Sequence, residues 1–155
     1  MNIEGLKSIM DAFDPASLLP ELEGVLNALT VAVRIATLAG PAMLLALGLL
    51  FLIFSPKEAN YYFGYRCAFG MGSVEAWQFT QRLAGIVWSA LGLLLTVGMA
   101  LLTKNFGQLE AYDVVWTGVK YILWEVGLVA AACLFVNTVV MTQFTYDGEY
   151  RRERR

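Results

Sequence analysis

The chain has 155 residues, of which 58% are hydrophobic and only 15% are charged, and its formal net charge is -2. Ordinary soluble domains carry about 25% charged residues, so this chain lacks the polar side chains that a water-exposed surface needs. Its weak negative charge argues against nucleic acid as a partner. Because the chain has no histidine, Ser-His-Asp catalysis and imidazole-ligated metal sites are excluded. No set of nucleophile and base is visible, so we expect neither an enzyme nor a bound metal or cofactor.

Residues 1–24 predict an acidic amphipathic segment. Asp14 followed by Pro15 is typical of a helix cap and a first-turn proline, which predicts a short helix after an earlier one. An amphipathic helix of this kind usually lies flat at a membrane interface. Its acidity weakens attraction to anionic lipid, so packing against the membrane-spanning helices is the alternative. The apolar residues that share one face of the earlier helix are Ile3, Leu6, Met10 and Phe13.

Three apolar runs follow, over residues 35–54, 83–103 and 121–142. A helix needs about 20 residues to cross a hydrocarbon core of about 30 Å. Lipid cannot satisfy backbone polar groups, so each run must be helical across that core. We therefore predict an all-α integral membrane protein with three transmembrane helices in a membrane domain over residues 25–146.

Two features of these runs bear on helix packing. Pro41 lies in the first run, where it removes one backbone hydrogen bond and predicts a kink. Small residues four positions apart recur in each run, and such pairs let helix backbones approach closely in lipid. The pairs are Ala36 and Gly40, Gly85 and Ser89, and Gly127 and Ala131.

The connection over residues 55–82 is the most distinctive part of the chain. It contains Gly64-Tyr65-Arg66 and, further on, Glu75. A planar guanidinium can clamp a carboxylate, and a glycine lets backbone come close, so Arg66 and Glu75 are candidate binding residues. Two interpretations stay open: an ion pair between them that staples the loop to the bundle, or a contact to a ligand or partner.

The second transmembrane helix is predicted to begin inside this connection. Ser73 is a favourable N-cap, and Glu75 falls in the first turn, where the helix dipole favours an anion. The helix then runs unbroken into the second span. This places Glu75, Gln78 and Arg82 on one face and Trp77 at the level of the membrane interface.

These residues resemble the SdpI family, which are membrane immunity proteins against a sporulation-delaying, membrane-active toxin. The mark of that family is an asparagine, then Gly-Tyr-Arg, then a Glu-x-Trp group that opens the next span. The corresponding residues here are Asn60, Gly64, Tyr65, Arg66, Glu75, Trp77 and Arg82. The resemblance covers about residues 44–102. Two positions depart from it, because Cys67 stands where threonine is common and Gln81 where asparagine is common.

The resemblance implies a bacterial membrane protein with an immunity or regulatory role. Members of the family are implicated in toxin resistance and in holding a transcriptional repressor at the membrane. The protein is then expected to bind a membrane-active peptide or a cytoplasmic regulator through residues 55–82, with the matching residues named above as its contacts.

Polar residues inside the third span suggest a second function. Glu125 lies about one turn inside the span, and an ionisable residue at that depth indicates a functional site. It is either a proton or cation site or the partner of Arg34, since both spans begin at the same membrane face. Asn137 is expected to hydrogen-bond to a neighbouring helix. The alternative function is therefore a small homo-oligomeric channel or transporter subunit, with Glu125 and the loop residues Arg66 and Glu75 as polar lining.

The distribution of basic residues predicts the orientation. The amino end and the second connection hold four of the eleven Lys and Arg residues, whereas the first connection and the carboxyl tail hold seven. The positive-inside rule places the second pair in the cytoplasm and the amino terminus outside, in a multi-pass protein of the cell membrane. The basic tail over residues 147–155 is expected to bind anionic lipid of the bilayer, with about 1 kcal/mol for each surface arginine. We expect Cys67 and Cys133 to stay unpaired.

Overall fold

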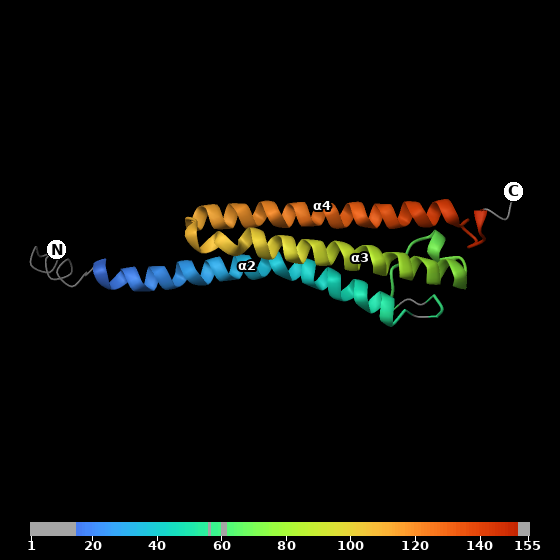
Figure 1. Ribbon diagram of the computed structural model, residues 1–155, viewed down its shortest axis with the longest axis horizontal. Coiled ribbons are helices and arrows are strands. Elements are labelled where there is room, and N and C mark those ends of the chain that lie inside the picture. The colour runs from blue at the N-terminus through green and yellow to red at the C-terminus, as the bar shows by residue number, and fades with distance from the viewer. Residues whose placement is uncertain (1–14, 56, 60–61, 152–155) are drawn as a thin grey trace, which may run out of the picture.

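Three long helices lie side by side, and each reverses the direction of the one before it (Figure 1). They are α2 (Pro15–Ile53), α3 (Val74–Leu102) and α4 (Ala111–Gln143), and the short 3-10 helices η1 (Phe69–Met71) and η2 (Thr103–Gln108) flank α3. Each long helix contains a stretch that is long and apolar enough to cross a membrane. The predicted all-α protein with three transmembrane helices is therefore confirmed.

The computed structural model describes residues 15–55, 57–59 and 62–151. Three parts of the sequence prediction lie outside the described residues. They are the amphipathic face over residues 3–13, Asn60, and the last four residues of the basic tail.

Helix α2 runs without a break from Pro15 to Ile53. A helix does begin at the predicted proline, but it is not a separate short helix. Pro20 and Gly24 lie inside α2 without ending it, and residues 25–33 contain neither proline nor glycine, so the helix continues into the first span. Partway along, α2 changes direction (Figure 1), as predicted from Pro41, which is fully buried.

Glycines bring α2 and α3 into close contact. A Cβ atom added to Gly48 would lie 2.9 Å from the Cα of Ser89, and one added to Gly92 would lie 2.7 Å from the Cα of Leu45. Neither position has room for a larger residue. The close approach predicted for the pair that includes Ser89 is confirmed. The one predicted at Gly127 is wrong, because nothing lies within 4 Å of a Cβ there.

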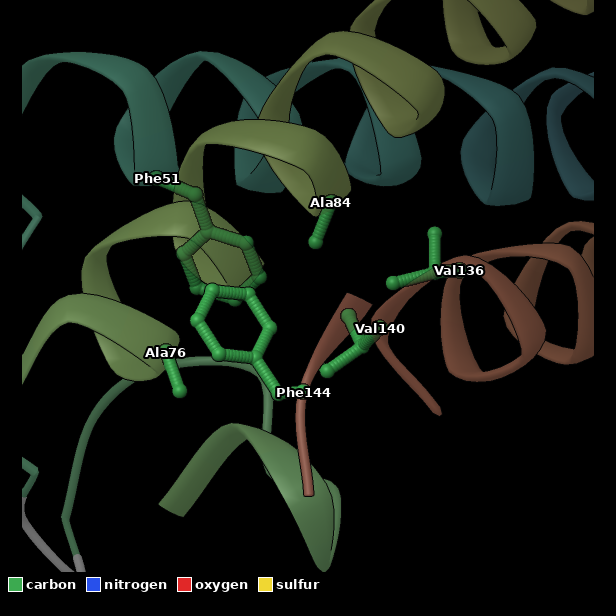
Figure 2. Close-up of a cluster of buried hydrophobic side chains, with 6 residues drawn as sticks. All are labelled: Phe51, Ala76, Ala84, Val136, Val140 and Phe144. Atoms are coloured by element: carbon green, nitrogen blue, oxygen red, sulfur yellow. The ribbon is translucent and has the colours of Figure 1, made fainter. Parts of the chain in front are cut away.

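The best-packed core lies at one end of the bundle, which we call the loop end. It comprises the end of α2, the described residues of the connection between α2 and α3, the start of α3 and the end of α4. Figure 2 shows its buried side chains, with Phe51 from α2 directed toward Phe144. The others are Ala76, Ala84, Val136 and Val140. Elsewhere large apolar side chains are exposed, such as Leu94 (71%) and Trp124 (70%), as lipid contact requires.

After α4 the chain folds back onto the start of α3. A single β-bridge pairs Phe144 with Tyr150, and Gly148 forms the turn with a φ of +78°, a conformation that favours glycine. The hydroxyl of Ser73 donates a 2.8 Å hydrogen bond to the carbonyl of Gly148, and it also caps α3 as predicted. The first residues of the predicted 147–155 tail therefore pack against this helix start.

Gly92→Ala is expected to destabilise the protein, because the added methyl group meets the backbone of Leu45 in the neighbouring helix. Overpacking typically costs about 1–3 kcal/mol, so the midpoint of thermal unfolding in detergent should fall. The matched control is Gly98→Ala in the same helix, where nothing lies within 4 Å of the added atom. Equal midpoints for the two variants would mean that the α2–α3 contact tolerates a larger residue.

Candidate functional site

Gly64 and Trp77 bring the two halves of the sequence pattern into contact. Gly64 has a φ of +119°, which an L side chain rarely adopts. A Cβ atom there would lie 2.7 Å from Cζ2 of Trp77 and 2.8 Å from Oε1 of Gln81. Trp77 is fully buried, so the loop covers its ring. The glycine is therefore required by the packing of the loop onto α3.

The side chain of Gln81 fixes the backbone of Tyr65. The backbone N–H of Tyr65 donates to Oε1 of Gln81, and Nε2 of Gln81 donates to the Tyr65 carbonyl, both at 2.7 Å. The Tyr65 hydroxyl reaches α4, where it lies 2.9 Å from Oδ1 of Asn137 and 3.1 Å from the carbonyl of Cys133. Burial raises the pKa of Tyr65 well above its ordinary value, so the hydroxyl stays protonated. Asn137 thus contacts the loop rather than a neighbouring helix.

An aromatic cluster packs against this loop. The ring of Tyr65 meets that of Trp88 edge to face at 5.4 Å between centroids. Phe51 packs against Trp88 at 5.3 Å and against Phe63 at 5.4 Å. Such contacts contribute beyond the apolar area that they bury, and they join the loop to both α2 and α3.

The predicted ion pair between Arg66 and Glu75 is wrong. Both side chains are exposed, and the described part of the chain contains no ion pair between them. The physical reason is that Gln81 and Trp77 already hold the loop on α3. Among the residues that the structure describes, none pairs with Arg66, whose side chain is exposed.

Glu75 instead faces a groove, which we call the loop-end groove. It has a volume of about 600 Å³ and lies between the end of α2 and the start of α3. Glu75, Gln78 and Arg82 line it together, so the prediction that they share one face is confirmed. Nε2 of Gln78 donates a 3.3 Å hydrogen bond to the carbonyl of Lys57. The remaining lining residues are Phe51, Leu52, Ser55, Lys57, Phe79 and Tyr150.

The predicted ion pair between Arg34 and Glu125 is also wrong. Arg34 is exposed and Glu125 is buried, and no ion pair joins these two described residues. The carboxyl lies against Gly40, where an added Cβ would be 3.3 Å from its Oε2. Gly40 is six residues beyond Arg34, which is about 9 Å along a helix. The two charges therefore lie at different depths.

Sequence reasoning named Gln81 only as a departure from the family pattern, and it missed its role. One signal was available, because Gln81 follows Trp77 by four residues and so lies on the same helix face. The predicted residues Gly64, Tyr65 and Trp77 are brought together around it, and Asn137 joins them through the Tyr65 hydroxyl.

Cys67, which stands where the resembled family commonly has threonine, is half-buried in the same loop. A Cβ atom on Gly70 would lie 2.8 Å from its Sγ. Burial raises the pKa of the Cys67 thiol above its ordinary value. Cys67 and Cys133 are both free, as predicted.

We expect Cys67 to react slowly with thiol reagents near neutral pH. The thiolate is the reactive form, and a raised pKa leaves less thiolate at pH 7. The labelling rate of a Cys133→Ala variant in detergent should rise with pH. It should reach its plateau at a higher pH than the rate of an ordinary thiol does. The control is a single cysteine at the exposed neighbour Ala68, with both native cysteines replaced by alanine. Identical pH profiles for the two thiols would contradict the expectation.

The chain matches a known family over more than half of its residues. The model of the SdpI/YfhL protein family matches residues 56–142, which include most of the loop end, all of α3 and nearly all of α4. No curated protein and no solved structure matches the chain. Since the family match covers more than half of the residues, the chain belongs to the SdpI/YfhL protein family.

Proposed function

We propose that this protein is an SdpI-like bacterial immunity protein that binds a membrane-active peptide through residues 55–82. Membership of the SdpI/YfhL family supports the immunity role. The observation that carries the proposal is the loop-end groove, because it offers about 600 Å³ beside the loop that bears the family pattern.

The chemistry of the groove suits a peptide that has both apolar and charged side chains. One part of its lining is apolar and includes Phe51 and Phe79, whereas Lys57, Glu75 and Arg82 supply charges of both signs. Among the described residues these three make no ion pair with one another. Their charges are therefore available to a bound peptide, and charge-assisted hydrogen bonds are among the strong ones.

The loop beside the groove is held in place before any ligand arrives. Gln81 fixes the backbone of Tyr65 with two hydrogen bonds, and the next residue, Arg66, is exposed. A surface that is already ordered loses less conformational entropy when it binds. Arg66 is therefore a second contact for the peptide, outside the lining of the groove.

Arg82→Gln is expected to weaken protection against the peptide. Cells that express the native chain should survive the sporulation-delaying toxin at concentrations that kill cells without it. Loss of one charged contact should weaken peptide binding by about tenfold or more, which a growth-inhibition titration measures. The matched control is Lys104→Gln, an exposed cation in η2 at the other end of α3.

Three outcomes distinguish the possibilities. Protection by the native chain and by Lys104→Gln, but not by Arg82→Gln, supports the proposal. Equal protection by all three chains would mean that the peptide does not bind in the loop-end groove. A native chain that gives no protection, but that copurifies with a transcriptional regulator through Arg82, replaces immunity with the regulatory role.

The orientation is part of the same proposal, since residues 55–82 are expected in the cytoplasm. A single cysteine at Ala68 should escape an impermeant thiol reagent in intact cells and react after the membrane is opened. A single cysteine at Asn105, exposed in η2 at the opposite end of α3, should react in intact cells. The reverse pattern would invert the topology.

A further inference from the structure

A second groove lies within the membrane-spanning part of the bundle, between α2 and α4. We call it the intramembrane groove, and its volume is about 600 Å³. Apart from Glu125, its lining contains no charged side chain. Other residues that line it are Gly40, Met43, Leu44, Trp88 and Val129.

The course of α2 accounts for the groove. α2 touches α4 near Val33, where a Cβ on Gly118 would meet the Val33 side chain. Further along, α2 bends and leans away from α4 (Figure 1). Pro41, from which the kink is predicted, and Gly40 beside it both line the groove. The space is therefore a consequence of the bent helix and of a missing side chain.

Two buried polar groups at this groove have no partner. Glu125 is 6% exposed. In the part of the chain that the structure describes, neither its Oε1 nor Nε1 of Trp88 has a hydrogen-bond partner. A buried polar atom that makes no hydrogen bond is costly, and an ionisable residue at this depth is costly as well. Both residues line the groove, and these atoms have hydrogen-bonding capacity that no described residue uses.

We propose that the intramembrane groove binds an apolar amphiphile that carries a primary amine, with the Glu125 carboxyl as the group that recognises the amine. A carboxyl and an amine together have zero net charge whichever of them holds the proton. Such a pair avoids placing an isolated charge in lipid, and the N–H groups satisfy the carboxyl oxygens. The apolar lining then accommodates the alkyl chain.

Other occupants fit the same lining less well. An acidic amphiphile would bring a second carboxyl next to Glu125, where like charges oppose one another. A neutral alkyl chain would fill the space but would leave the carboxyl with its missing partner. The preference for an amine is therefore the property that separates this site from a groove filled by lipid.

The test compares dodecylamine with dodecanol on the purified full chain in a nonionic detergent. Dodecylamine should raise the midpoint of thermal unfolding in a saturable way, because a ligand that binds only the folded state stabilises it. Dodecanol at the same concentration should give no comparable rise. Equal rises for the two compounds would overturn the proposal, because the groove would then accept any alkyl chain.

Two variants locate the effect. Glu125→Gln keeps the shape of the side chain but removes the acid, so its apparent affinity for dodecylamine should fall about tenfold or more. The matched control, Glu110→Gln, removes an exposed carboxylate at the start of the same helix and should respond as the native chain does. A full response by Glu125→Gln would overturn the proposal. It would show that the amine acts by changing the charge of the detergent micelle, an effect that does not depend on Glu125.

A second measurement needs no change at Glu125. A brominated alkylamine should quench part of the tryptophan fluorescence of the native chain, and that part should vanish in Trp88→Phe. Dodecylamine should displace the quencher at concentrations at least tenfold lower than dodecanol does. Equal displacement by the two compounds, or quenching that survives in Trp88→Phe, would count against the site.

Discussion

The loop end depends on the amide of Gln81. This fully buried side chain satisfies both the N–H and the carbonyl of Tyr65 at 2.7 Å. Non-helical backbone close to a membrane needs such partners, because lipid offers none. We call this pair of hydrogen bonds the clamp. With the clamp in place, Gly64 lies against Trp77 and the Tyr65 hydroxyl reaches α4. The Gln81 amide thus joins the loop to α3, and the Tyr65 hydroxyl joins it to α4.

This clamp assigns different roles to the three residues of Gly64-Tyr65-Arg66. The glycine and the tyrosine are structural, since one makes room for Trp77 and the other bonds to α3 and α4. Only the arginine is exposed. The three consecutive residues therefore combine two packing roles with one exposed charge, and the function we propose depends on Arg66 and on the loop-end groove.

Local patterns predicted the helices, whereas the pairing of distant charges was not predictable. The apolar runs, the cap at Ser73 and the kink at Pro41 each depend on neighbours in the chain, so the sequence was sufficient for them. The pair of Arg66 with Glu75 rested on complementary charge alone, which sets no distance between two residues. The role of Gln81 was missed for a related reason. Its spacing from Trp77 places both on one face of α3, but that spacing does not report that the loop folds back over this face.

The bend in α2 connects the two grooves. Before the bend, α2 contacts α4 beside Gly118; beyond it, Gly48 packs onto Ser89 of α3 instead. This change of partner leaves the space that Glu125 lines. It also carries Phe51 to the loop end, where its side chain forms part of the core and part of the wall of the loop-end groove. A straight α2 would therefore close the site in the membrane and remove one wall from the site at the loop end.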